Sequence, residues 1–323
     1  MATNIALAII LLLTLLFTST LFNSTVDENR ERIEGLARRF AAPFRRLGAQ
    51  IGVGWQAVAG AGAGSWTERA VGPVLILLLT GLVYSFNEPG LGLNNKSLLL
   101  FISLVVPIGL MSYVYEGGEA LFTRHRFRVA AGVKLFPTAL AIGAGFVALS
   151  RLVDFQAPII YGFIASSAVL VPVSLERRQT GQAVFFPALL LLALSVSAWG
   201  LVIPLRELSE GSNNWWTYLP GETAAILFAG GIEGLVFAMI PVRFMDGAKV
   251  WAWNWLLWVP VFVIPAFLFS WAILNPEAKE FDALLEGRVI TALCLVAAYV
   301  AVTVAMWAYF LIRSAERGAP AQP

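Results

Sequence analysis

The chain has 323 residues, of which 59% are hydrophobic and only 13% are charged, and its mean hydropathy is +0.77. Soluble domains average about 45–50% apolar and about 25% charged residues, so this composition excludes an ordinary soluble protein and predicts one that crosses a membrane several times. The formal net charge of +2 identifies no partner. The single cysteine, Cys294, excludes an intramolecular disulfide, and the single histidine, His125, excludes any site that needs two imidazoles from one chain.

Nine apolar segments have the length of a spanning helix, about 17–25 residues, or approach it. In chain order they are 5–22, 70–86, 97–115, 135–149, 157–173, 183–203, 224–240, 251–274 and 289–312. Segment 135–149 is short and rich in Gly and Pro, so it is either a tilted span or a re-entrant segment buried in protein. We therefore expect an all-α, polytopic membrane protein with about nine transmembrane helices.

The chain divides into four expected parts. Residues 1–22 form an amino-terminal transmembrane anchor, which we expect to be retained because no cleavage site precedes a soluble domain. Residues 23–69 form a cytoplasmic segment. Its first half has an apolar stripe between arginines, typical of a basic helix in the headgroup layer, although a solvated charged linker is the alternative. Its second half is Gly-rich. Residues 70–312 form the polytopic core, and residues 313–323 form a cytoplasmic tail.

The charges in the loops predict the orientation. With nine spans, one set of alternating loops carries 17 of the 22 Lys and Arg residues and the other set carries 5. Because Lys and Arg are concentrated in cytoplasmic loops, the amino terminus is expected outside and the carboxyl terminus in the cytoplasm. If 135–149 does not span, the split becomes 15 against 7. With all nine spans, the aromatic residues of 212–220 lie outside, as expected for a membrane-interface belt.

Two short segments carry the most specific pattern in the chain. The first segment consists of Tyr115, Glu116, Gly118, Glu119, Ala120, Leu121, Arg124 and Arg126. The second, within residues 237–250, consists of Phe237, Pro241, Met245, Asp246 and Gly247. In this order they resemble the two metal-binding segments of the site-2 protease family of intramembrane zinc proteases, a His-Glu-x-x-His helix and an Asn-x-x-Pro-x-x-x-Leu-Asp-Gly segment. The second also resembles the Phe-Gly-Leu-Leu-Pro stretch that names a group of bacterial membrane proteins.

The resemblance covers about residues 97–250 and implies a protease-like core. The degenerate site positions Tyr115, Glu116, Glu119 and Asp246 would lie together at the cytoplasmic face. The cleft between the two motif-bearing spans would be lined by Gly118, Pro241 and Gly247.

Departures from the family pattern argue against proteolysis. Tyr115 and Glu119 replace both zinc-binding histidines, and Ala238 replaces the asparagine. A catalytic zinc needs three protein ligands, usually with imidazoles among them. We therefore predict no catalytic residues, no bound metal and no cofactor, although the oxygens of Glu119 and Asp246 would suit a harder cation. The alternative is that the acids only pair with nearby arginines at the headgroup level.

A third feature is Glu233, an acid near the middle of the apolar segment 224–240. An unpaired charge there is costly, so the carboxyl group is expected to be protonated or paired. Either it joins helices through a hydrogen bond, or it belongs to a proton or substrate path.

These features favour a non-proteolytic, site-2 protease-like protein of the bacterial cytoplasmic membrane that binds a membrane helix or peptide as a regulator, chaperone or assembly subunit. Its expected partners are the lipid bilayer and a membrane protein or transmembrane peptide, with no nucleic acid. One alternative is a transporter or channel component that uses its intramembrane carboxylates. The other is a metal-dependent protease with a divergent site.

Overall fold

The computed structural model describes residues 2–35, 66–86, 88, 90–135, 140, 143–145, 147–148, 165–169, 175–243, 245–273 and 288–315. Most of the predicted cytoplasmic segment 23–69 and the end of the tail lie outside these residues. The elements in chain order are α1 (Ala2–Glu28), α3 (Trp66–Ser85), α4 (Asn95–Ser112), the π-helix η1 (Tyr113–Gly117), α5 (Gly118–Phe127), β1 (Ala131–Leu135), β2 (Ala165–Val169), α7 (Arg177–Glu207), the 3-10 helix η2 (Trp215–Tyr218), α8 (Leu219–Ala238), α9 (Asp246–Trp253), α10 (Trp255–Leu268), the π-helix η3 (Phe269–Ile273) and α12 (Arg288–Ala315).

Five helical stretches in the described part of the chain are long and apolar enough to cross a membrane, by length and composition. They are Asn95–Phe127, Arg177–Glu207, Trp215–Ala238, Trp255–Ala272 and Val296–Arg313. The apolar part of α3, Gly72–Ser85, is shorter. These stretches agree with a largely helical membrane protein, as the composition predicts.

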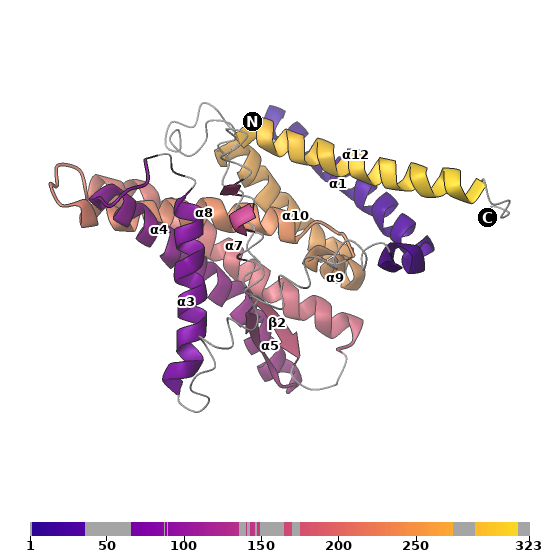
Figure 1. The fold of residues 1–323 in the computed structure, drawn as a ribbon, viewed down its shortest axis with the longest axis horizontal. Helices are drawn as coiled ribbons and strands as arrows, with labels where there is room; N and C mark the ends of the chain where they lie inside the picture. Colours follow the sequence, from indigo (N-terminus) through magenta and orange to yellow (C-terminus); the bar gives the residue numbers. More distant parts are fainter. Residues whose placement is uncertain are drawn as a thin grey trace.

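Helix α8 is at the centre of the fold. Helices α4, α7 and α10 pack against it, and α3 packs against the outer side of α4 (Figure 1). Of the most apolar 18 residues of Trp215–Ala238, the stretch that contains α8, 72% are buried. For Val296–Arg313 of α12 the share is 11%. The chain therefore buries its second motif-bearing helix most completely.

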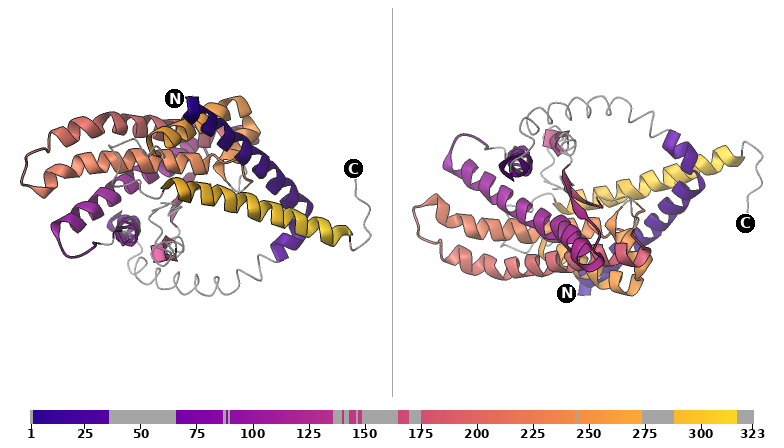
Figure 2. Two further views of the ribbon diagram at one scale, coloured as in Figure 1. Left: turned by 90° about the horizontal axis from the view of Figure 1, so that it is seen from above. Right: turned by 90° about the horizontal axis from the view of Figure 1, so that it is seen from below.

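The amino- and carboxyl-terminal helices pair at one side of this bundle. Helices α1 and α12 cross beside it, while α4, α7 and α8 extend away from them (Figure 2). The hydroxyl groups of Ser19 and Tyr299 lie 3.2 Å apart and hydrogen-bond across the pair. Helix α1 also packs on α10, which brings the amino-terminal helix next to the second motif segment.

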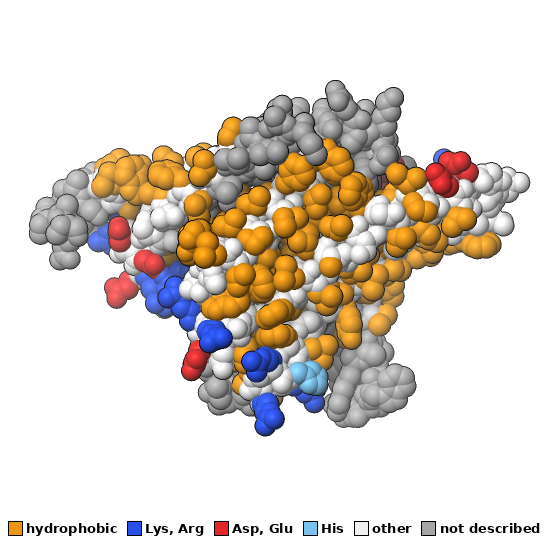
Figure 3. Space-filling model, turned by 180° about the vertical axis from the view of Figure 1, so that it is seen from behind, with side chains coloured by type: hydrophobic (Ala, Val, Ile, Leu, Met, Phe, Trp, Pro, Cys, Tyr) orange, Lys and Arg blue, Asp and Glu red, His pale blue; other side chains and the backbone are white. Residues whose placement is uncertain are grey.

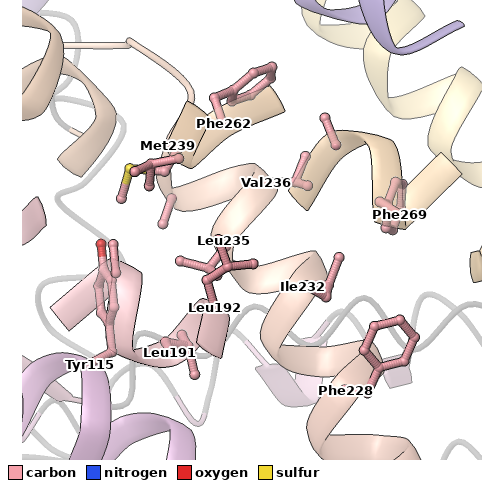
Figure 4. Close-up of a cluster of buried hydrophobic side chains, with 14 of the residues drawn as sticks. Tyr115, Leu191, Leu192, Phe228, Ile232, Leu235, Val236, Met239, Phe262 and Phe269 are labelled. Carbon is pink, nitrogen blue, oxygen red and sulfur yellow. The ribbon is translucent and has the colours of Figure 1, made fainter. Parts of the chain in front are cut away.

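The main hydrophobic core joins α7, α8 and α10. Figure 4 shows Leu191 and Leu192 from α7 facing Leu235 and Met239 near the end of α8, with Tyr115 at the edge of the same cluster. Leu235 and Met239 are fully buried. Between membrane helices, close van der Waals packing stabilises such a cluster, so it fixes the carboxyl end of α8 and the turn that follows it.

A two-stranded antiparallel sheet replaces part of one predicted helix. Strand β2 lies inside the predicted span 157–173 and pairs with β1, with Ala131 opposite Val169 and Leu135 opposite Ala165. The prediction of a continuous helix there is wrong for residues 165–169. A short apolar run has the same hydropathy as a strand or a helix, and only the pairing partner distinguishes the two. Most of segment 135–149 lies outside the described residues.

Two other helix boundaries differ from the prediction. The predicted span 251–274 is interrupted at Asn254, whose side-chain oxygen accepts hydrogen bonds from the backbone N–H groups of Leu256 and Leu257 and begins α10. The predicted span 97–115 instead continues through η1 into α5, giving one helical stretch of 33 residues. The first motif therefore lies inside a helix rather than at its end.

Candidate functional site

The first motif coincides with a local irregularity of its helix. Residues Tyr113–Gly117 form a π-helical turn between α4 and α5, and its Tyr115 and Glu116 are buried. Such turns insert one extra residue, widen the helix locally and are frequent at functional sites. Tyr113, in the same turn, is 68% exposed, whereas Tyr115 is 8% exposed. The turn thus directs Tyr115 inward and Tyr113 outward.

The second motif begins a short helix. Asp246 is the first residue of α9, after Met245 in an extended conformation. A carboxylate in the first helical turn is stabilised by the helix dipole. Helix α9 is anchored by Val250, which is fully buried, and by Trp253, which packs against Gly181 and Phe185 of α7. Asp246 is thereby held beside α7, the helix on which the turn that carries Tyr115 also packs.

The two motifs meet through one direct hydrogen bond, and a second bond within α9 completes the contacts of its carboxylate. The Tyr115 hydroxyl donates to Oδ2 of Asp246 at 2.9 Å, across 131 residues of sequence. Lys249, one helical turn after Asp246, donates from Nζ to Oδ1 of the same carboxylate at 2.6 Å. Asp246 is therefore bridged on one side by a phenol and on the other by an ammonium group. We call Tyr115, Glu116, Glu119, Asp246 and Lys249 the motif cluster.

Lys249 is the cation of this cluster. Burial is the largest single influence on its pKa and lowers it, but the negative charges of Asp246, Glu119 and Glu116 together outweigh burial and raise the pKa above its usual 10.5. The ammonium group is thus held in its charged form by three carboxylates from both motifs.

The residues present do not fit a catalytic zinc. The cluster has no imidazole, and the carboxylate of Asp246 is already paired with a positive charge. Catalytic zinc binds three protein side chains and keeps an open position for water. In the part of the chain that the structure describes, no group of three or more His, Cys, Asp or Glu side chains is arranged to hold a metal ion.

The three predicted cleft residues lie at close contacts. A β-carbon on Gly118 would lie 3.2 Å from Pro187, so α5 and α7 approach tightly there. A β-carbon on Gly247 would lie 2.1 Å from the backbone oxygen of Met239, so only glycine fits under the turn after α8. Pro241 is buried in that turn. These residues join the motif segments to their neighbours.

The turn that precedes Asp246 is fastened from two directions. The side chain of Asn23 in α1 donates to the backbone oxygen of Pro241 and accepts from the backbone N–H of Arg243, both at 2.9 Å. From α10, Nε1 of Trp258 donates to the backbone oxygen of Met239 at 2.8 Å. Because Asp246 follows this turn directly, helices α1 and α10 fix its position.

Two ion pairs lie at or next to the second motif. Arg243 pairs with Asp27 of α1, and the cation beside the motif acids is Lys249. The sequence analysis did not single out Lys249. The spacing of Asp246 and Lys249 does indicate this pair, because a lysine three residues after an aspartate on a helix lies on the same face.

Glu233 lies apart from the motif cluster, on the part of α8 that faces α3 and α4. It is buried, and its charge interacts electrostatically with Tyr84 of α3. Gly231 nearby meets Ser195 of α7, where a β-carbon would lie 2.1 Å from the Ser195 hydroxyl oxygen. The small residues let the helices approach closely around the acid, as expected for packed membrane helices.

No family model, curated protein or solved structure matches this chain. Function is therefore argued from the geometry of its own residues.

Proposed function

We propose that this chain is a non-proteolytic relative of the site-2 protease family that binds a membrane-inserted helix or peptide, as a regulator, chaperone or assembly subunit of a bacterial cytoplasmic membrane. The single observation that supports it most is the 2.6 Å ion pair between Lys249 and Asp246. It places a fixed positive charge among the acids of both motifs. The Tyr115 hydroxyl donates to the same carboxylate, so the two segments that resemble a zinc site are joined by protein side chains, which suits a fold that keeps protein binding without the chemistry.

A surface for a partner helix lies on the outer side of the first motif helix. Val106, Leu110, Tyr113 and Leu121 recur every three to eight residues along it and are 41%, 41%, 68% and 44% exposed. Tyr113 belongs to the π-turn that also positions Tyr115. A helix seated on this face would therefore contact the motif turn directly.

Photocrosslinking in intact membranes tests partner binding. A photoreactive benzoylphenylalanine at Tyr113 is expected to give discrete crosslinked products with a membrane-inserted segment. The matched control is the same residue at Leu201, an apolar position of α7 with 53% exposure. Equal crosslinking at both positions would show only lipid-facing exposure and would contradict the proposal.

A second experiment tests the absence of catalysis. Purified protein is expected to contain far less than one equivalent of zinc by elemental analysis. Glu116→Gln keeps the shape of the side chain but removes the charge that a general base needs, so partner crosslinking should be unchanged. Zinc near one equivalent, or cleavage of a helical substrate that Glu116→Gln abolishes, would favour a metalloprotease with a divergent site.

A second candidate function is a transporter or channel component, and the buried Glu233 beside Tyr84 favours it. An ionisable side chain at membrane depth marks an ion or proton path in many transporters. The test is proton or cation flux in proteoliposomes. Flux that Glu233→Gln abolishes would favour transport, whereas unchanged partner crosslinking in that variant would leave the peptide-binding proposal intact.

A further inference from the structure

One end of the α5–α7 pair is strongly basic. Six exposed cationic or titratable side chains, which we call the basic collar, lie there: Arg124, His125, Arg126, Arg128, Arg177 and Arg178. Figure 3 shows Lys and Arg side chains gathered around the single histidine at the lower end of this face, beneath a broad apolar surface. The charge at one end of a membrane protein influences which lipids, ions or proteins that end binds.

Packing brings the two halves of the basic collar to the same level. Gly118 of α5 lies against Pro187 of α7, and the ring of Phe122 stacks on that of Phe186 with centroids 4.8 Å apart. The helices therefore run antiparallel. From the contact of Gly118 with Pro187, eight residues along each helix cover about 12 Å. At that distance α5 reaches Arg126, and α7, followed toward its amino end, reaches the turn that carries Arg178. The antiparallel pairing of β1 and β2 also returns the chain to this end.

Helix stability explains only part of this charge. Arg124, His125 and Arg126 lie in the last turn of α5, where cations interact favourably with the helix dipole. Arg177 and Arg178 instead lie in the first turn of α7, where the dipole disfavours them. Arg128 has φ of +56°, in the left-handed region that favours glycine. Arginine is thus present at three positions where local structure favours other residues.

The surface next to the basic collar is apolar. Leu121 of α5, together with Phe186 and Leu190 of α7, is about half exposed, at 44%, 45% and 56%. Trp251 and Trp255, at the junction of α9 and α10, are exposed as well, as is typical of side chains at a membrane–water interface. A molecule bound at this end would contact arginine guanidinium groups and apolar side chains at the same time.

The opposite end of the same helices has a different charge. There Arg206 pairs with Glu222 at 3.2 Å, and Glu207 and Glu210 are exposed. Lys96 lies at this end too, because α4 continues into α5. The described charges are therefore mainly cationic at one end of the bundle, where Glu176 is the exposed acid before Arg177, and largely balanced or acidic at the other.

We propose that the basic collar binds the phosphate-bearing headgroups of anionic phospholipids, whose acyl chains lie along the apolar face of Phe186 and Leu190. Guanidinium groups form paired hydrogen bonds with phosphate oxygens, and the cytoplasmic leaflet presents anionic lipids. The mixture of arginine and exposed hydrocarbon selects a lipid over a soluble anion, because a free phosphate gains nothing from Phe186 or Leu190.

Lipid binding to the full-length protein in detergent tests this directly. Native mass spectrometry and thermal unfolding followed by tryptophan fluorescence would compare phosphatidylglycerol with phosphatidylcholine of the same acyl chains. Phosphatidylglycerol should bind at least tenfold more tightly. Each arginine near an anionic surface contributes about fivefold in affinity, so Arg178→Gln should lose about fivefold and Arg126→Gln/Arg178→Gln about 25-fold.

The matched control is Lys96→Gln, which removes one positive charge at the other end and should change affinity by less than about twofold. Without lipid, the Arg178→Gln variant should unfold at the wild-type temperature, because its side chain is exposed. Equal binding of the two lipids, an equal loss in Lys96→Gln, or equal stabilisation by inorganic phosphate would each overturn the proposal. So would an acidic peptide, polyglutamate, that stabilises the protein more than phosphatidylglycerol does.

Discussion

Replacing Lys249 with methionine is the most direct test of the motif cluster. The change keeps an unbranched side chain of similar length and removes the ammonium group that bonds Asp246. The side chain of Asp246 is only 14% exposed, whereas that of Lys249 is 40% exposed. Exposed ion pairs contribute about 0.2–1 kcal/mol, and truncating one partner of a fully buried pair costs about 3–5 kcal/mol. The Lys249–Asp246 pair lies between these two cases in exposure, and water screens the lysine. We therefore expect the free energy of unfolding to fall by about 1–3 kcal/mol.

The measurement is the free energy of unfolding in a detergent denaturant titration, with Lys96→Met as the matched control. Lys96 is exposed at the start of α4, so its replacement should change stability by less than about 0.5 kcal/mol. The double variant Asp246→Asn/Lys249→Met should regain most of the loss, because it leaves no buried charge without a partner. A double variant less stable than Lys249→Met would refute the reasoning, as would a Lys249→Met that equals its control.

The pH dependence of folding stability is an independent test of the Lys249 interactions. The carboxylates of both motifs raise the pKa of Lys249 above its usual 10.5 in the folded protein, against the lowering by burial. A raised folded pKa stabilises the protein fully below the unfolded pKa, and this contribution is lost as the pH rises through the folded value. Wild-type stability should therefore fall more steeply above about pH 10.5 than that of Lys249→Met.

Three further substitutions test how the cluster is supported, each read out as unfolding free energy in the same titration. Gly247→Ala should cost more than about 3 kcal/mol because its β-carbon would collide with backbone atoms of Met239, whereas Gly234→Ala, with open space around it, should be neutral or stabilising. Asn23→Leu removes both side-chain bonds to the turn before Asp246 and should cost about 1–3 kcal/mol. Trp258→Phe keeps an aromatic ring but leaves the backbone oxygen of Met239 without its donor, so we expect a loss of about 1–3 kcal/mol. A change below about 0.5 kcal/mol in any of these three would contradict its assigned contact.

The sequence predicts the long helices well because their apolar length is itself the signal. Segment 183–203 lies within α7, segment 224–240 coincides with α8 up to Ala238, and 289–312 lies within α12. Boundaries are less predictable, since they depend on single side chains such as Asn254, which ends one helix and caps the next. The pairing of β1 with β2 depends on residues thirty or more positions apart, and hydropathy carries no information about such a partner.

The candidate site, like the fold, is only partly predictable from the sequence. The order and the predicted side of the two motifs suffice to predict that Tyr115 and Asp246 approach each other, and the structure joins the two side chains by a hydrogen bond. The π-turn at 113–117 was not predicted, since nothing in the residue types distinguishes it from an α-helical turn. Lys249 was missed because the resemblance draws attention to metal ligands, and a lysine is not one. A count of charges on α9 would have found it.

The position of Lys249 explains how the motif acids remain in the fold without histidines. A buried carboxylate needs a positive charge or hydrogen-bond donors nearby, or it destabilises the protein. Asp246 has both, an ammonium group from its own helix and a phenol from the helix that resembles the zinc-binding one. A metal ion leaves when it is chelated, whereas this cation is covalently part of α9. The link between the two motif segments is therefore independent of any metal supply, which suits a site that holds helices together and presents a surface, and which is unsuited to activating water.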